Sequence, residues 1–226
     1  MERTKIWFLE NFSMLKVLTP EEKRLMHKVT TMKDVPKNQV LYFPEDSSEC
    51  VFLLKKGKIK ISKISKDGRE VILAILGPGE VFGELCLTGQ TKREEIAEVT
   101  DDAVICKVGI NDFQKIMGLN ANFNLEVTKL IGFKLKKIQN RLENIVFNTS
   151  EQRIRNFIKE AVNAFGRQVK GDSEQFVVEL GITHEEVAKL TVTSRQTVTT
   201  VFRELEKNGI IKYDRKRIYV RNMSAI

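Results

Sequence analysis

The chain has 226 residues, a hydrophobic content of 42%, a formal net charge of +8 and an isoelectric point near 9.3. This length suits one large or two modest domains, and the positive charge favours an anionic partner. No apolar run approaches the ~18–20 residues of a membrane-spanning helix, and the N-terminus lacks the apolar core of a signal peptide, so a cytoplasmic location without membrane association is expected.

The first half of the chain predicts one short helix followed by a β-rich domain. Thr19-Pro20-Glu21-Glu22 combines an N-cap, a first-turn proline and a capping-box carboxylate, which predicts a helix over Pro20–Val29. Short β-rich segments then alternate with Gly, Pro and Asp turns, among them a hairpin signal at Asp67-Gly68. The predicted strands are Val40–Phe43, Val51–Leu54, Lys58–Ile64, Val71–Leu76, Glu95–Val99 and Ala103–Val108. Such a series is typical of an all-β sandwich or roll.

A long helix is predicted over Leu125–Phe147. Five apolar residues along it follow the alternating spacing of four and three that is typical of a coiled-coil seam. The seam residues are Ile131, Leu135, Ile138, Leu142 and Ile145. The helix can pair with a second subunit through this seam or pack as an ordinary core helix. Thr149 with Gln152 caps a further helix over Gln152–Ala164, and a polar loop is expected over Phe165–Gln175.

The C-terminal segment predicts a helix-turn-helix followed by a basic hairpin. Thr183 with Glu186 forms a capping box, and Thr193 with Gln196 repeats the signature, which predicts that a second helix starts there. Its apolar stripe consists of Val198, Val201, Phe202 and Leu205. After Asn208-Gly209, two short strands enclose a basic tip, as in a winged helix. The alternative is an ordinary helical hairpin with a solvated polar face.

The polar face of the second helix is rich in hydrogen-bond donors that suit DNA. Arginine can bind guanine and glutamine can bind adenine with two hydrogen bonds each, while hydroxyl and basic groups suit phosphates. The candidate base-reading residues are Arg195, Gln196, Thr199 and Thr200. The candidate phosphate-contacting residues are Thr183, His184, Ser194, Thr197, Arg203, Arg215 and Lys216.

Segment 182–221 resembles the DNA-binding domain of the catabolite activator protein and FNR family of bacterial regulators. The S-R-x-T-V pattern at Ser194, Arg195, Thr197 and Val198 carries the resemblance. It implies that Arg195 is the principal base reader and that a homodimer binds a pseudo-palindromic operator with half-sites ~34 Å apart. Gln196 and Thr200 replace the Glu and Arg of cyclic-AMP-responsive members, which predicts a different operator.

The resemblance also implies an α+β architecture in three parts. Residues 1–118 form a jelly-roll sensor domain of the cyclic-nucleotide-binding type, residues 119–148 the dimerisation helix, and residues 149–226 the winged helix-turn-helix domain. Val192 stands in the bend where the family usually has Gly. In relatives a loop corresponding to Arg167–Ser173 can touch RNA polymerase, which makes the polymerase a possible further partner.

Phe82-Gly83-Glu84-Leu85 followed by Arg93 resembles the phosphate-binding cassette of cyclic-nucleotide sensors. The resemblance implies that Gly83 admits the ligand to the backbone, Glu84 binds the ribose and Arg93 binds the phosphate. Glu94 follows Arg93, however, and a carboxylate ~4 Å from a phosphodiester is repulsive by roughly 1–4 kcal/mol.

Two further differences concern the same pocket. The segment from Gly83 to Arg93 is one residue shorter than in the cyclic-AMP activators, and Ile138 and Gln139 replace hydroxyl residues that hold adenine there. The sequence thus predicts a regulator that cyclic AMP does not control. An internal Glu84–Arg93 ion pair is favoured over cyclic AMP binding, and another small effector in this pocket remains an alternative.

No cofactor, metal or enzymatic activity is predicted. The only histidines are His27 and His184, and residues 40–115 contain none, whereas metal-dependent rolls need clustered His and carboxylate ligands. Cys50, Cys86 and Cys106 are scattered and fit reduced thiols rather than a disulfide framework or an iron–sulfur site; a redox role for Cys86 is open. The remaining alternatives are a cyclic-nucleotide-dependent activator and an effector-sensing module that binds protein.

Overall fold

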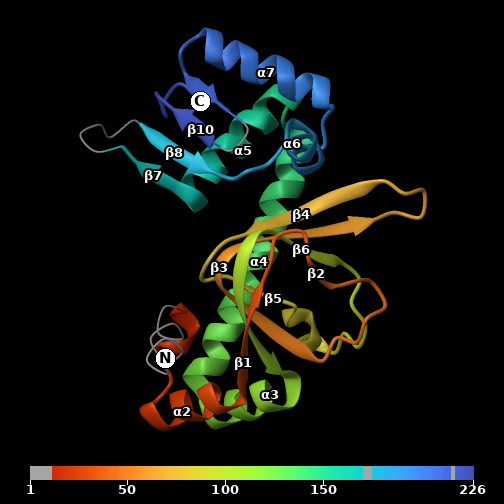
Figure 1. Cartoon of the computed structure of the whole chain (residues 1–226), viewed down its shortest axis with the longest axis vertical. Coiled ribbons are helices and arrows are strands. Elements are labelled where there is room, and N and C mark those ends of the chain that lie inside the picture. The colour runs from red at the N-terminus through yellow and green to blue at the C-terminus, as the bar shows by residue number, and fades with distance from the viewer. Residues whose placement is uncertain (1–11, 170–174, 215–216) are drawn as a thin grey trace. The chain divides into compact units, whose positions relative to one another are not determined.

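The computed structural model describes residues 12–169, 175–214 and 217–226 (Figure 1). The chain divides into two compact units. One is formed by the residues up to Asp67 with Leu73–Lys137, and the other by Gly68–Ile72 with Ile138–Ile226. The fold is α+β, with an N-terminal jelly roll, a long helix and a C-terminal helix-turn-helix domain with a β-hairpin wing, as the sequence predicts.

Helical segments frame the start of the roll. A 3-10 turn, η1 (Ser13–Leu15), precedes α2 (Pro20–Val29), whose bounds confirm the predicted helix. The Thr19 hydroxyl accepts a hydrogen bond from the Glu22 amide at 3.3 Å, and the Glu22 carboxylate accepts one from the Thr19 amide at 2.8 Å. This reciprocal capping box satisfies two helix-end donors at once. Figure 1 shows α2 beside α3 (Ile110–Leu119) at one end of the roll.

The roll is built on one antiparallel sheet of six strands. They are β1 (Thr30–Val35), β2 (Val40–Tyr42), β3 (Cys50–Ile64), β4 (Glu70–Leu76), β5 (Val81–Phe82) and β6 (Ile96–Gly109). The order is β1-β6-β3-β4, with β2 paired to β6 and β5 paired to β3. The sequence pattern missed β1 and β5. The short η2 helix (Glu84–Thr88) follows β5 directly.

The prediction of separate strands on either side of Gly57 and of Asp101-Asp102 is wrong, because β3 and β6 each continue through these points. The β3–β6 register shifts between Leu54 and Ile59, so the pairing is bulged rather than ended. Gly57 has φ +85°, and a Cβ there would lie 2.4 Å from the Asp102 carbonyl oxygen. The glycine therefore marks a close backbone approach inside a long strand.

The long helix α4 (Ala121–Phe147) starts four residues before the predicted Leu125. The Asn120 side-chain oxygen accepts a hydrogen bond from the Phe123 amide at 2.9 Å and caps the helix. Phe123 packs on Phe113 of α3 in the roll core, with ring centroids 5.4 Å apart. Along the predicted seam, Leu135 is 56% exposed; Ile138 and Leu142 are exposed to a similar degree.

The second unit contains a three-helix core and a small sheet. Its elements are α5 (Ser150–Phe165), β7 (Gly166–Gln168), β8 (Phe176–Glu179), α6 (His184–Thr191), α7 (Arg195–Lys207), β9 (Ile211–Tyr213) and β10 (Arg217–Val220). The sheet order is β7-β8-β10-β9. The Thr149–Gln152 capping box of α5 is confirmed. The prediction of a loop at the start of Phe165–Gln175 is wrong, because Gly166–Gln168 pairs with β8; residues 170–174 lie outside the described residues.

Candidate nucleic-acid interface and sensor pocket

Helix α6 begins as the sequence predicts. The Thr183 hydroxyl accepts a hydrogen bond from the Glu186 amide at 3.2 Å, and the Glu186 carboxylate accepts one from the Thr183 amide at 2.8 Å. Val187 and Ala188 are buried in the core of the unit. The helix ends at Thr191, and the C-cap residue Val192 takes the left-handed conformation with φ +52° and ψ +52°. A β-branched residue is strained there, which explains why glycine is usual in such bends.

The prediction that Thr193 caps the second helix is wrong. Ser194 is the N-cap of α7: its backbone is extended and its hydroxyl accepts a hydrogen bond from the Thr197 amide at 3.0 Å. The Thr193 amide still bonds to the Ala188 carbonyl, so Thr193 closes α6 instead. Only Thr193 is followed three residues later by a Gln, yet the adjacent Ser194 provides the cap.

Helix α7 separates an apolar and a polar face along its length. The predicted stripe, Val198, Val201, Phe202 and Leu205, is buried in the core of the unit. On the other side Arg195, Gln196, Thr200 and Arg203 are exposed. The helix therefore presents two guanidiniums, one amide and one hydroxyl to solvent, and these are groups that read base edges or bind phosphate. Thr197 is half-buried, with its hydroxyl 2.8 Å from that of Ser194.

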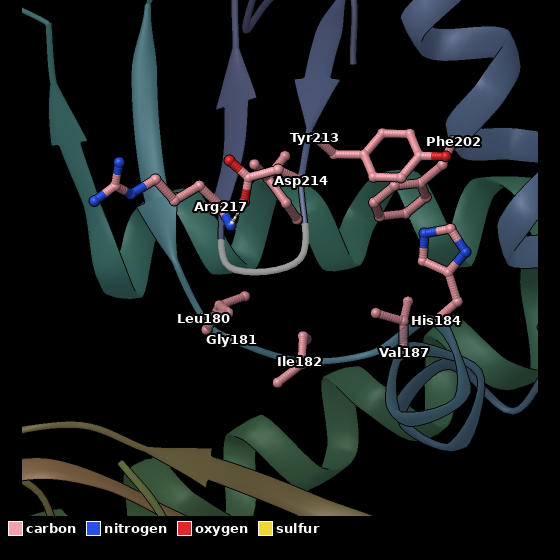
Figure 2. Close-up of a pocket in the computed structure, with 10 residues that line it drawn as sticks. Leu180, Gly181, Ile182, His184, Val187, Phe202, Tyr213, Asp214 and Arg217 are labelled. Carbon is pink, nitrogen blue, oxygen red and sulfur yellow. Dashed lines mark hydrogen bonds between the residues drawn. The ribbon is translucent and has the colours of Figure 1, made fainter. Parts of the chain in front are cut away.

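Thr199 and His184 are engaged with each other and with the fold. The Thr199 hydroxyl donates to the Arg195 carbonyl at 2.9 Å and lies 3.0 Å from Nδ1 of His184. Figure 2 shows the His184 ring beside Phe202 and Tyr213, with ring centroids 5.0 and 5.2 Å away. Burial, together with the charges of Arg195 and Arg203, lowers the pKa of His184. The geometry thus favours a structural role for both residues, in holding α7 against the core of the unit.

A small cavity adjoins this aromatic cluster. Its volume is about 20 Å³, and its lining includes His184, Phe202 and Tyr213 (Figure 2). A single water needs roughly 10–15 Å³ of such volume, so the cavity suits one water and is too small for an organic effector.

Two hydrogen bonds between Asp214 and Arg217 join the two strands of the wing near its turn. The Asp214 amide donates to the Arg217 carbonyl at 2.9 Å, and the Arg217 amide donates to the Asp214 carboxylate at 2.9 Å. The Arg217 guanidinium lies 2.6 Å from the Glu179 carboxylate on β8. The strands confirm the predicted hairpin, whereas the predicted phosphate contacts Arg215 and Lys216 lie outside the described residues.

In the roll, Arg93 is withdrawn from the surface. It is 1% exposed and donates to the Gly83 carbonyl at 2.9 Å and to the Cys50 carbonyl at 2.5 Å. Its guanidinium lies 4.7 Å from the centroid of the Tyr42 ring, within cation–π range. Gly83 has φ +70°, and a Cβ there would lie 2.8 Å from Arg93 Nη1. The residue expected to hold a phosphate is therefore bound to the protein's own backbone.

The predicted ion pair between Glu84 and Arg93 is wrong. Glu84 bonds instead to Lys134 of α4 at 2.7 Å, and Lys134 also donates to the Val81 carbonyl at 2.7 Å. The pattern missed this partner because it lies fifty residues away along the chain. Glu94 points outward to Lys63 at 2.7 Å, with 64% of its side chain exposed. Its carboxylate is thus neutralised at the surface.

The remaining residues of the predicted effector pocket are Leu85, Ile138 and Gln139. Leu85 is 40% exposed on η2. Ile138 and Gln139 belong to the second unit, so their place in an effector pocket stays a prediction. Cys86 is buried, and burial raises its pKa to about 11, which disfavours the reactive thiolate.

The described residues hold neither a metal-ligand cluster nor a membrane-spanning helix. Across 12–169, 175–214 and 217–226, no three His, Cys, Asp or Glu side chains group closely enough to hold a metal ion. Within those ranges, too, no helix has the length and hydropathy to cross a bilayer.

Comparison with known proteins identifies two domains. Residues 32–120 match the model of the cyclic nucleotide-binding domain, and residues 152–226 match the Crp-like helix-turn-helix domain. The anaerobic regulatory protein of Bacillus subtilis is 23% identical over 84% of this chain and 79% of its own length. The cyclic AMP receptor protein of Thermus thermophilus is 25% identical over 92% of both chains. The structure of FixK2 from Bradyrhizobium japonicum superposes with a TM-score of 0.77 at 21% identity, covering 87% of this chain and 95% of FixK2.

Proposed function

Because this chain belongs to the CRP/FNR family of bacterial transcription regulators, we propose that it reads a specific operator in duplex DNA through α7. Members of this family bind DNA and act as dimers. The observation that carries the proposal is the exposure of Arg195, Gln196 and Thr200 on one face of a helix whose other face is buried. Arg195 supplies two donors to a guanine and Gln196 pairs with an adenine.

The surrounding groups divide into phosphate contacts and supports. Ser194 and Thr197 stand at the N-terminus of α7, and Arg203 lies two turns further along its exposed face. Hydroxyls and a guanidinium in these places fix the position of the helix on the DNA backbone without reading sequence. Thr199 and His184 hold the helix against the core.

The proposed assembly is a homodimer paired through the α4 seam. Leu135, Ile138 and Leu142 expose 56%, 66% and 61% of their surface, and a second copy of the helix would bury them. Two recognition helices would then meet half-sites ~34 Å apart. We further propose that the dimer works in the cytoplasm; contact with RNA polymerase through the segment at Arg167–Ser173 stays a prediction.

Selection of binding sites from random duplex DNA tests this proposal. The expected product is a pseudo-palindrome with half-site centres about 10–10.5 base pairs apart, bound by a protein of twice the chain mass in light scattering. Failure to enrich any sequence would contradict DNA reading and favour a module that binds protein. Enrichment of a single, asymmetric half-site would contradict the dimer.

We further propose that cyclic AMP is not the effector that controls this regulator. Arg93 is already bonded to the Gly83 and Cys50 carbonyls, so binding a phosphate there requires breaking two buried hydrogen bonds. The second candidate is a cyclic-nucleotide-dependent activator, which the presence of Gly83 and Glu84 beside Arg93 favours. Calorimetric titration with cyclic AMP and cyclic GMP separates the two: we expect no heat of binding, and micromolar binding of either nucleotide would overturn the proposal.

A further inference from the structure

A polar groove of about 350 Å³ lies between the C-terminal part of α4 and the middle of α5, wholly within the second unit. Five of its nine lining residues are asparagines, and neither the sequence analysis nor the proposed function uses them. They are Asn140, Asn144, Asn148, Asn156 and Asn163. Such a concentration of carboxamides makes this groove chemically distinct from the recognition helix and from the roll.

One hydrogen bond between the two helices and one at the end of α4 organise the centre of the groove. The side-chain oxygen of Asn144 accepts from Asn148 Nδ2 at 2.6 Å and from Asn156 Nδ2 at 2.9 Å. A carboxamide has two N–H donors and two acceptor lone pairs. Asn148 and Asn156 each commit one donor to Asn144, so each keeps an oxygen and a second N–H beyond these bonds. The groove floor is thus fixed in orientation but retains binding capacity.

The spacing of three asparagines at the end of α4 matches a peptide backbone. Asn140 and Asn144 lie four residues apart on α4, and Asn148 follows the helix directly, with its amide still bonded to the Asn144 carbonyl at 3.2 Å, so the three succeed one another at intervals of about 6 Å. An extended chain turns equivalent backbone groups to the same side every two residues, about 6.6 Å. Since a carboxamide carries the same donor and acceptor groups as a peptide bond, we propose that this groove binds an extended segment of a partner polypeptide through its backbone.

The composition of the lining favours a polypeptide over other ligands. Small-molecule sites are predominantly apolar, whereas Phe147 is the one apolar residue in this lining. It is 80% exposed and offers an aromatic surface to one side chain of the bound segment. Asparagine can also pair with adenine, but Glu143 and Glu160 outnumber Lys159 in the lining, which disfavours a phosphate backbone.

Dimerisation through the proposed seam would leave part of the groove accessible. Asn140 and Asn144 each lie two residues after a seam position, Ile138 and Leu142. At 100° per residue, two residues turn the side chain by about 200°, to the opposite face of the helix. The part of the groove formed by Asn140 and Asn144 therefore faces away from the seam.

The test uses random-sequence decapeptides displayed on phage and selected on the full-length protein. Enriched peptides, synthesised with a fluorescent label, are then titrated by anisotropy against wild type and variants. Asn140 and Asn163 are exposed, so Asn140→Ala and Asn163→Ala leave the fold intact. The matched control is Gln114→Ala, which removes an exposed amide of α3 outside the lining.

We expect each asparagine variant to weaken binding about 2- to 10-fold, the effect of one hydrogen bond, and Gln114→Ala to leave binding unchanged. Methylating alternate backbone nitrogens of the peptide should abolish binding, because the backbone is the recognised feature. The proposal is overturned if no peptide is enriched, if enriched peptides bind both asparagine variants as tightly as wild type, or if N-methylation has no effect. Binding of single-stranded oligonucleotides that depends on Asn140 would likewise overturn it, in favour of a base-binding site.

Discussion

The guanidinium of Arg153 donates to the carbonyl of Val192 at 3.0 Å and thereby ties α5 to the bend of the helix-turn-helix. The same side chain donates to the Ile145 carbonyl in the last turns of α4 at 3.1 Å and to the Ser150 hydroxyl at 3.2 Å. One arginine thus joins the end of the long helix, the start of α5 and the strained residue Val192 before α7.

Replacing Arg153 by Met should destabilise the protein by about 1–3 kcal/mol, because the substitution leaves the partly buried Ile145 carbonyl and the Val192 carbonyl without their donor. Thermal unfolding measures the effect as a fall of about 2–4 °C per kcal/mol for a chain of this size. Arg155→Met is the control: it removes a partly exposed pair with Glu151, worth about 0.3–0.5 kcal/mol, and one exposed hydrogen bond to the Ala225 carbonyl at 3.3 Å. Equal effects of the two substitutions would contradict the bridging role of Arg153.

Val192→Gly should stabilise the protein by about 1 kcal/mol. The left-handed conformation costs a residue with a Cβ about 1–2 kcal/mol. Glycine avoids this cost, but part of the gain is lost because a glycine makes the unfolded chain more flexible. Val192 is 48% exposed, so little packing is lost. Urea unfolding of the Gly and Ala variants measures the effect. Alanine retains the Cβ and should bring little of the gain; an Ala variant as stable as the Gly variant would show that strain is not the cause.

Arg93→Lys should destabilise the roll by about 1–3 kcal/mol. A lysine cannot reproduce the two-pronged donation to the Gly83 and Cys50 carbonyls or the flat contact with Tyr42. The neighbouring Lys92→Ala removes an exposed pair with Glu45 and serves as control, with an expected change near zero. If Arg93→Lys melts at the wild-type temperature, the self-bound arrangement of Arg93 is not what the protein adopts in solution.

His184 should make stability fall as pH is lowered. Burial depresses its pKa in the folded state below the ordinary value near 6.5, so the unfolded chain binds the proton more readily. The contribution of neutral His184 is therefore complete above pH 6.5 and is lost as pH falls through that value toward the folded-state pKa. Urea unfolding at pH 7.5 and 5.5 should show a smaller loss in His184→Gln than in wild type. An identical loss in both proteins would contradict this origin.

How far the sequence predicts this molecule depends on how local each interaction is. The capping boxes at Thr19, Thr149 and Thr183 are complete within four residues, and all three are confirmed. The prediction that Thr193 caps the second helix is wrong, because the position of the cap depends on a backbone torsion that residue types alone do not fix.

Local sequence patterns could not predict interactions between residues that are distant along the chain. Glu84 and Arg93 lie close in sequence and carry opposite charges, yet Glu84 pairs with Lys134 and Arg93 with backbone carbonyls. The continuous strand β3 was likewise read as two, since the bulge at Gly57 resembles a turn locally. The face of α7 was predictable because helical periodicity alone sorts its buried and exposed residues.

The central claim, that Arg195 reads a base, is tested most directly by the affinities of the selected operator and of operators with single base-pair changes. Wild type is compared with Arg195→Lys, which keeps the charge but loses the two-donor fork, and with Lys207→Ala in the last turn of α7. The account predicts that Arg195→Lys loses about 1–3 kcal/mol of discrimination at one base pair per half-site while Lys207→Ala keeps it. Full discrimination at every position by Arg195→Lys would contradict the claim.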